Sequence, residues 1–244
     1  MPHIIQNPPL QLCPLGDSAV VLQFGGEIDL NTHHRIRAVS QVLEQQPFAG
    51  LVEFVPAFTT ITVYYDPWVL SQEGKLDAYS EAVQQLEVLL EQAEKAEPAP
   101  ARVVELPVVY GGKYGPDLQE VADHAGLDAA EVIRIHSSGK YHVYMIGFAP
   151  GFPYLGGMDA RIATPRKASP RASIPAGSVG IAGAQTGVYP ISTPGGWQLV
   201  GRTPLQLFNP NRDEPSLLQA GDEVRFVPIP EEEYIDREEG QAWV

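Results

Sequence analysis

The side chains with the clearest chemical potential lie between residues 147 and 203. Arg166 and Arg171 each follow a proline and stand five residues apart in the same loop-like segment. Each guanidinium can donate paired hydrogen bonds to a carboxylate or a phosphate. Gln185 and Tyr189, on the next turn-rich segment, can donate to or accept from a neutral polar group. We therefore predict that these four side chains face one cleft that binds an anion or a small amide.

Aromatic side chains alternate with glycine and proline in the preceding stretch, GFAPGFPYLGG. Glycine permits positive φ and close backbone approach, and proline fixes the neighbouring turns. Such a loop can hold Phe148, Phe152 and Tyr154 rigidly around a cleft, so Phe148 and Tyr154 join the candidate substrate-binding residues. Two alternatives stay open. The glycines and prolines can serve barrel corners without a ligand, and the two arginines can pair with acids of the protein's own surface.

Other catalytic signatures are missing from the sequence. Gly111, Gly112 and Lys113 lack the upstream glycine and the following Ser or Thr of a P-loop. The six histidines lack a metal-ligand spacing, and with one cysteine no zinc site is indicated. We therefore predict no metal site, and no catalytic residue can be assigned.

Composition narrows the partners and the compartment. The chain carries 30 acidic and 16 basic residues, for a net charge of −14. A surface this negative repels phosphate backbones and anionic lipids, so we expect neither nucleic acid nor membrane as a partner. Cys13 alone cannot form an internal disulfide, and no apolar run approaches the ~20 residues that span a bilayer. The N-terminus does not resemble a signal peptide, so we expect a cytoplasmic protein.

The elements before residue 94 predict a small α+β module. Residues 18–24 have the β-branched character of a strand, and Asp29 or Asn31 can cap the helix that follows. Residues 51–55 and 59–65 read as a hairpin, and a second helix is expected over residues 76–93.

A change in composition marks the joint to a second module. The segment at 94–102 is charged and then rich in proline and alanine, which a helix cannot easily continue through. We therefore predict an N-terminal α+β domain over residues 1–98 and a C-terminal domain over residues 99–244. The second domain is predicted to hold helices at 117–124 and 128–136, short strands between glycine- and proline-rich turns, and a solvated acidic tail. The expected strands are 103–109, 141–147, 178–182, 188–191, 198–200, 205–208 and 223–228, which favours a mainly-β barrel or sandwich.

Several of these segments together resemble the 5-oxoprolinase B subunit/KipI family, also labelled allophanate hydrolase subunit 1. The matching segments are LGDSAVVLQFG, GFAPGFPYLGGMD, TPR, SPR, IPAGSVGIAG, QTGVYPISTPGGWQLVGRTP and LLQAGDEVRFVP. The resemblance implies an α+β N-terminal domain followed by a cyclophilin-like barrel. It also implies that the chain works with two 5-oxoprolinase partners, a C subunit that is KipA-like and an A subunit of the LamB/YcsF type. Together such proteins cleave 5-oxoproline to L-glutamate at the expense of ATP, whose site is not located by the resemblance.

Two other functions share the same sequence features. KipI-type proteins inhibit a histidine kinase, and related domains are fused in urea amidolyases, which implies a carboxyltransferase-like component working with biotin. No biotin-accepting AMKM-type motif occurs in the chain, so any biotin has to arrive on another chain. We favour the enzyme because the regulation of one kinase is the narrower role. The cyclophilin likeness does not imply prolyl isomerase activity, because function belongs to sites and not to folds.

Limited proteolysis tests the predicted joint. Because a segment rich in proline and alanine between two modules makes few contacts, we expect the first cuts within residues 94–102, with fragments of about 100 and about 140 residues. Mass spectrometry of the early fragments identifies the cut sites. First cuts elsewhere, with no fragment ending near residue 100, would contradict the predicted boundary.

Overall fold

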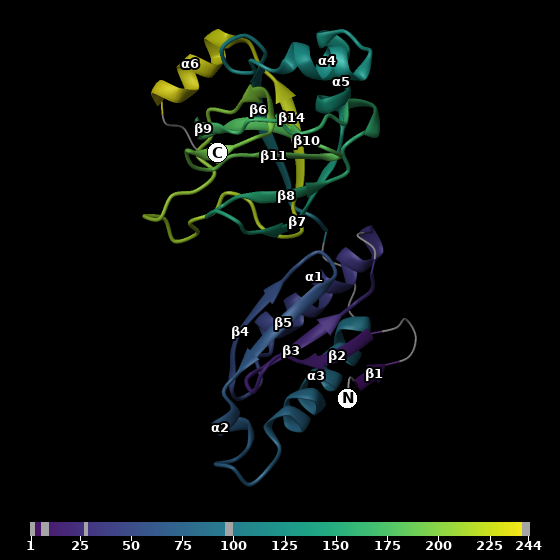
Figure 1. The fold of residues 1–244 in the computed structure, drawn as a ribbon. Helices are drawn as coiled ribbons and strands as arrows, with labels where there is room; N and C mark the ends of the chain where they lie inside the picture. Colours follow the sequence, from purple (N-terminus) through teal and green to yellow (C-terminus); the bar gives the residue numbers. More distant parts are fainter. Residues whose placement is uncertain (1–2, 6–9, 27–28, 96–99, 241–244) are drawn as a thin grey trace. The chain divides into compact units, whose positions relative to one another are not determined.

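The computed structural model describes residues 3–5, 10–26, 29–95 and 100–240. Contacts between residues divide the chain into two compact units, residues 1–100 and 101–244. Figure 1 traces the elements of both units. Part of the predicted joint, residues 96–99, lies outside the described residues, so the predicted domain boundary stays a prediction.

The first unit is built on an antiparallel sheet of five strands in the order β1-β2-β3-β5-β4 (Figure 1). Ile61, Val63 and Tyr65 of the strand β5 are buried, whereas the residues between them are half-exposed. Side chains of a strand alternate between the two faces of a sheet, so one face packs on the core. The strands are β1 (His3–Ile5), β2 (Leu10–Pro14), β3 (Ala19–Gln23), β4 (Leu51–Pro56) and β5 (Thr60–Tyr65).

Three helices complete this unit: α1 (Leu30–Gln45), α2 (Pro67–Leu70) and α3 (Ala78–Lys95). The Asp29 carboxylate caps α1 by accepting a hydrogen bond from the Thr32 amide at 2.9 Å, and Asn31 lies inside the helix. The helices α1 and α3 pack on each other and on the sheet through apolar stripes. The predicted strand at 18–24, the hairpin and both long helices are confirmed, whereas β1, β2 and α2 were not predicted.

Seven strands of the second unit close into a barrel in the order β10-β11-β8-β7-β14-β6-β13, and β13 pairs back onto β10. The predicted mainly-β barrel is confirmed. Only β14 and β6 pair in parallel among these neighbours. The barrel strands are β6 (Val103–Tyr110), β7 (Tyr141–Ile146), β8 (Pro153–Gly156), β10 (Ser178–Ala182), β11 (Gln185–Val188), β13 (Gln198–Arg202) and β14 (Glu223–Pro228).

The remaining elements pack around the barrel. The predicted helices appear as α4 (Leu118–Ala125) and α5 (Ala129–Ser138), which contact β13 and β14. Two short strands, β9 (Arg171–Ile174) and β12 (Thr193–Gly195), form a separate antiparallel pair, and η1 (Ala160–Ile162) is a short 3₁₀ turn.

Two predicted strands are wrong, and the tail has structure that was not predicted. The strand expected at 188–191 ends at Val188 in β11, because Pro190 has no amide hydrogen for the ladder. Residues 205–208 bury Leu205 and Leu207 alternately, like a strand, but only Phe208 forms a bridge. The acidic tail is mostly exposed to solvent, as predicted, but it forms the helix α6 (Glu231–Gly240), whose Tyr234 is 1% exposed and anchors it.

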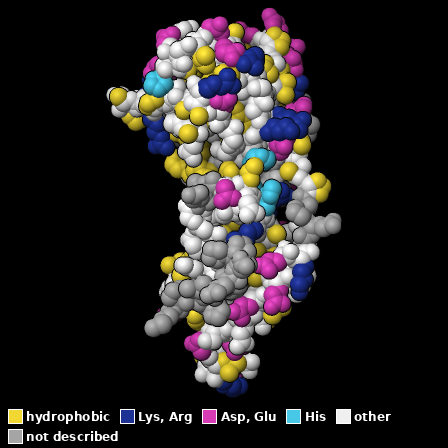
Figure 2. Space-filling model, turned by 90° about the vertical axis from the view of Figure 1, so that its right-hand side faces the viewer, with side chains coloured by type: hydrophobic (Ala, Val, Ile, Leu, Met, Phe, Trp, Pro, Cys, Tyr) yellow, Lys and Arg dark blue, Asp and Glu magenta, His cyan; other side chains and the backbone are white. Residues whose placement is uncertain are grey.

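The charges do not gather into one field on the face shown in Figure 2, where acidic and basic side chains are interspersed. On this face the excess of acidic residues does not form a single patch. No helix in the described part of the chain is long and apolar enough to cross a membrane.

A fully buried histidine ties α5 to the barrel interior. The Thr186 hydroxyl donates to the Gly180 carbonyl at 3.0 Å, so its oxygen accepts from Nε2–H of His136 at 2.9 Å. The Tyr110 hydroxyl then donates to Nδ1 of His136 at 2.8 Å. All the polar atoms of the imidazole are satisfied in the neutral form, and burial lowers the pKa of His136 from 6.5 to about 3.

This pKa makes the stability of the second unit depend on pH. Between pH 6.5 and pH 3 the unfolded chain binds a proton at His136, whereas the folded chain does not. The free energy of unfolding therefore falls as the pH falls. We expect a loss of about 2–3 kcal/mol between pH 6 and pH 4 from this residue alone. Urea unfolding at each pH measures it.

The matched variants separate this effect from the titration of carboxylates. In His136→Gln the loss between pH 6 and pH 4 should shrink by about 2 kcal/mol, whereas His124→Gln changes an exposed histidine and should leave the wild-type loss intact. Equal losses in the wild type and in His136→Gln would show that His136 does not couple folding to pH.

Candidate functional site

The segment after β7 presents an aromatic side chain to solvent. A tight turn begins at Gly147, and Phe152 donates its amide hydrogen to the Ala149 carbonyl at 3.0 Å. Within the turn Phe148 adopts a φ of +67° and its side chain is 75% exposed. A non-glycine residue in this region costs of order 1 kcal/mol, and such strain is concentrated at functional sites. The turn therefore holds an aromatic ring outward at a backbone cost.

A cluster of rings lies behind Phe148. The ring of Phe152 is 5.6 Å from that of Phe148, 5.3 Å from Tyr154 and 5.9 Å from Trp197, each edge to face. Tyr189 packs against Phe152 and Trp197 in the same geometry. Edge-to-face contacts fix ring orientations as well as burying area, so these aromatic side chains form a rigid wall.

Glycine allows this wall to be so close-packed. A methyl group on Gly195 would lie 2.5 Å from the Tyr189 hydroxyl and 2.7 Å from Ile174 Cδ1. A methyl group on Gly187 would lie 3.0 Å from the Trp197 ring. These glycines are therefore needed for contact between backbone and ring, as well as for turns.

The wall and its neighbours line a small open pocket of about 170 Å³. The strands β8 and β11, which lie side by side in Figure 1, contribute Tyr154 and Gln185 to it. A pocket this small fits a ligand of amino-acid size. It is lined by Phe148, Phe152, Tyr154, Arg166, Gln185, Tyr189, Pro194, Gly195, Gly196 and Trp197.

Five of the six candidate residues line this pocket: Phe148, Tyr154, Arg166, Gln185 and Tyr189. Arg166 is exposed and forms no ion pair with any described residue. Burial raises the pKa of the Tyr189 phenol, and a hydrogen bond with the Trp197 backbone and the positive charges of Arg166 and Arg171 oppose that rise. The pocket therefore combines an aromatic wall with one unpaired cation, an amide and a protonated phenol.

Arg171 is the exception to the predicted cleft. It does not line the pocket, and its guanidinium donates to the Asp117 carboxylate at 2.7 Å and to the Trp197 carbonyl at 3.5 Å. A buried carboxylate is a stronger partner for a cation than solvent is. The Arg171 side chain therefore points toward Asp117 and not into the pocket. The alternative of pairing with the protein's own acids is thus correct for Arg171, although Asp117 is buried and not a surface residue.

A polar network next to the pocket was not predicted. Asp117 also accepts from Lys167 at 3.1 Å and from the Leu199 amide at 2.7 Å. Burial raises the pKa of Asp117, but the hydrogen bonds from Arg171, Leu199 and Lys167 outweigh it and leave the pKa below its usual range. The position of Asp117 at a helix start reads as a capping residue, so no local signal identifies this role.

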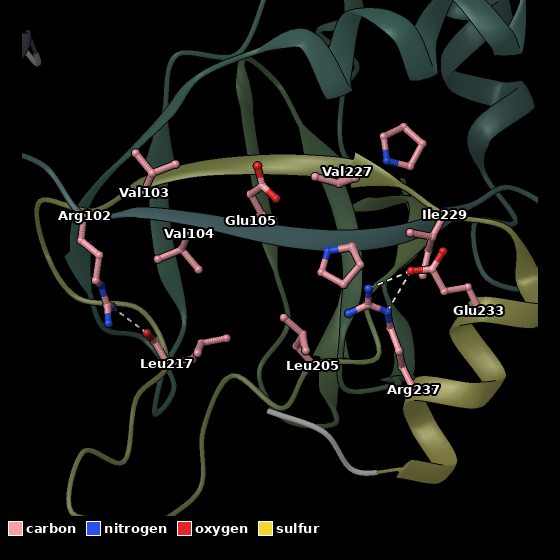
Figure 3. Close-up of a pocket in the computed structure, with 12 residues that line it drawn as sticks. Arg102, Val103, Val104, Glu105, Leu205, Leu217, Val227, Ile229, Glu233 and Arg237 are labelled. Atoms are coloured by element: carbon pink, nitrogen blue, oxygen red, sulfur yellow. Dashed lines mark hydrogen bonds and ion pairs between the residues drawn. The ribbon is translucent and has the colours of Figure 1, made fainter. Parts of the chain in front are cut away.

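A larger groove of about 750 Å³ lies between α6 and the adjacent strands β6 and β14 (Figure 3). Its floor is apolar, and both of its arginines are already paired. Arg102 binds Asp222 at 2.6 Å and Arg237 binds Glu233 at 2.8 Å. With no unpaired cation to orient a polar ligand, the groove is a weaker candidate than the aromatic pocket.

The described residues contain no cluster of three or more His, Cys, Asp or Glu side chains that could hold a metal ion. Lys113, next to the two glycines considered as a phosphate loop, pairs with Glu231 at 2.7 Å.

Comparison with known proteins places this site in a family. Residues 10–218 match the family described as "Carboxyltransferase domain, subdomain C and D". The B subunit of 5-oxoprolinase from Bacillus subtilis (strain 168) is 52% identical over 227 residues, covering 92% of this chain and 95% of that protein. The protein of the same name from Escherichia coli O157:H7 is 48% identical over 214 residues, covering 88% and 94%.

A solved structure agrees with the sequence relatives. The crystal structure of TTHA0988 superposes with a TM-score of 0.73 at 36% identity over 87% of this chain, which spans 40% of that longer chain. Over residues 10–218 the chain is thus a member of the carboxyltransferase subdomain C and D family. The chain belongs to the family of the 5-oxoprolinase B subunit.

Two neighbouring glycines provide a test of the pocket wall. Gly195→Ala should displace the Tyr189 ring and lower the free energy of unfolding by about 1–3 kcal/mol, since the added methyl group has no space. Gly196→Ala is the control, because its nearest neighbour is at 3.6 Å. Urea unfolding and the emission of Trp197 measure both variants, and a Gly195→Ala protein as stable as Gly196→Ala would refute the described packing.

Proposed function

We propose that this chain is the B subunit of an ATP-dependent 5-oxoprolinase and that its aromatic pocket binds 5-oxoproline for cleavage to L-glutamate. Near-full-length relatives that carry this name support the assignment of the subunit. The observation that carries the assignment of the site is the unpaired guanidinium of Arg166 beside an aromatic wall. Substrate-sized pockets with few convergent polar groups are the usual form of such sites.

The chemistry of 5-oxoproline suits the pocket group by group. Its carboxylate takes a paired hydrogen bond from Arg166, a charge-assisted contact that a neutral ligand cannot offer. Its lactam presents one N–H donor and one carbonyl acceptor, which the Gln185 amide and the Tyr189 hydroxyl can satisfy. The apolar ring carbons pack on the wall that includes Phe152 and Trp197. A ligand with an anion, an amide and an apolar ring uses every side of the pocket.

The activity requires more than this chain in our proposal. The partners are a C subunit that is KipA-like and an A subunit of the LamB/YcsF type, since relatives named as a B subunit imply further subunits. ATP is consumed by the assembled complex. We assign no phosphoryl-transfer step to residues of this chain. The role of the chain in this proposal is to bind and orient the lactam.

A second function has one specific observation in its favour, the carboxyltransferase description of the matching family. A carboxyltransferase would transfer a carboxyl group between biotin on another chain and a small amide. Adding biotin or avidin to the assembled complex separates the two functions. Turnover of 5-oxoproline that needs ATP and ignores avidin supports the oxoprolinase, and inhibition by avidin supports the carboxyltransferase.

Arg166→Ala in the reconstituted complex tests the assigned site. We expect kcat/KM for 5-oxoproline to fall at least ~10-fold, because the variant removes a charge-assisted contact with the substrate carboxylate. Glutamate release measured with and without ATP gives the rate. The isolated chain should show no activity.

Arg161→Ala is the matched control. Arg161 is an exposed arginine of the same unit, pairs with Asp159 at 2.7 Å and does not line the pocket. It should leave kcat/KM unchanged. Wild-type kinetics in Arg166→Ala, or robust turnover by the isolated chain, would count against the proposal.

A further inference from the structure

Three cations follow one another in the segment that borders the pocket, and two of them are paired. Lys167 lies 3.1 Å from the Asp117 carboxylate and 2.7 Å from Glu120. Arg171 lies 2.7 Å from Asp117. Arg166 forms no ion pair with any residue that the structure describes, and it alone of the three lines the pocket.

Asp117 is held rigidly enough to determine which cations of this segment form ion pairs. Its amide donates to the Leu199 carbonyl at 2.9 Å, and its carboxylate accepts from the Leu199 amide at 2.7 Å. Although Asp117 precedes α4, its side chain does not cap that helix. A capping contact is worth about 1 kcal/mol to a helix, and here the carboxylate is committed to the segment beside the pocket instead.

The backbone on both sides of Arg166 is fixed as well. The Pro165 carbonyl accepts from the Gln198 side-chain amide at 3.1 Å, and the Lys167 amide donates to the Gly196 carbonyl at 2.7 Å. Gly196 is itself a pocket residue. With both neighbours tied to the wall, the position of Arg166 depends on the network around Asp117 and Gln198.

We propose that Asp117 is a positioning residue that binds Lys167 and Arg171 and so leaves Arg166 as the anion-binding group of the pocket. The identity of the anion in this inference rests on the proposed function. The ion pairs of Asp117 with Lys167 and Arg171 rest on the geometry alone. A buried carboxylate needs compensating cations, and two cations from one short segment satisfy it while fixing that segment. Arg171 thereby acts on the pocket through Asp117 and does not contact the ligand.

The structure supplies a matched control for the substitution Asp117→Asn. Asp222 is as buried as Asp117, at 4% exposure each. It pairs with Arg102 at 2.6 Å and accepts a backbone amide, that of Gln219, at 2.7 Å. Asp222→Asn therefore breaks the same kind of contact in the same unit without touching the aromatic pocket.

Two measurements on the assembled complex distinguish positioning from general stability. In Asp117→Asn we expect the KM for 5-oxoproline to rise at least ~10-fold while kcat changes less than ~3-fold. Phenylglyoxal labelling, mapped by mass spectrometry, should modify Arg171 at least ~10-fold faster, because its charged hydrogen bond is lost. In Asp222→Asn the KM and the Arg171 labelling should stay at wild-type values, while the labelling of Arg102 rises.

Each alternative result bears on the inference. An Asp117→Asn complex with the KM of Asp222→Asn overturns the positioning role, even where Arg171 labelling rises. If the wild-type complex does not turn over 5-oxoproline, the proposed function fails, and the labelling of Arg166 then decides. If Asp117→Asn changes the rate at which phenylglyoxal labels Arg166 by at least ~3-fold, the positioning role is supported. An unchanged labelling rate of Arg166 overturns it.

A second pair of variants covers the case in which Asp117→Asn does not assemble. Arg171→Ala should raise the KM about 10-fold, whereas Arg171→Lys keeps a cation for Asp117 and should recover most of the loss. A KM in Arg171→Lys as high as in Arg171→Ala would overturn the inference, because the charge facing Asp117 would then not be what matters.

Discussion

The strand β10 is hydrogen-bonded along both edges, to β11 on one side and to β13 on the other, and this double pairing closes the barrel. All five of its residues are buried. The closure sets β11 and β13 on either side of β10. It places Gln185 at the start of β11 and Trp197 just before β13 around one small pocket.

Closure also explains the unusual density of glycine in this region. Gly180 lies on β10 and Gly187 lies opposite it on β11, and a methyl group on either would crowd Trp197. A paired strand normally loses stability with glycine in its interior. Here the loss is offset by an indole packed closely on two backbones, so the glycines serve the pocket wall rather than the ladder.

The sequence predicted secondary structure best where apolar residues repeat with the period of a helix or of a strand. The helices α1 and α3 and the strand β5 carry clear repeats of buried residues, and α3 and the hairpin of β4 and β5 were predicted near their observed bounds. The strands β8, β9 and β12 were not predicted, because three or four residues are too few to show a period. Arg166 and Arg171 look equivalent in sequence, each after a proline. Asp117, which distinguishes them, is 54 residues from Arg171 along the chain and sits in a different local pattern.

The net charge of the protein is negative, whereas the pocket contains the positive charge of Arg166. A net charge of −14 disfavours the approach of an anion at low ionic strength. Salt at physiological concentration screens exposed charges beyond about 8 Å. Among the residues that line the pocket, Arg166 carries the positive charge. In the proposed function, recognition of the anion is therefore a local property of this side chain.

The parallel pairing of β6 with β14 has a consequence for synthesis on the ribosome. The first strand of the second unit, β6, cannot pair with its last strand, β14, until both have been synthesised. The contact between Arg102 and Asp222 likewise joins residues that are 120 positions apart in the chain. Contacts of such long range form late, and an unpaired strand is exposed to association in the meantime. The nascent chain can complete α4 and α5 early, but the barrel closes only after residue 228 has left the exit tunnel.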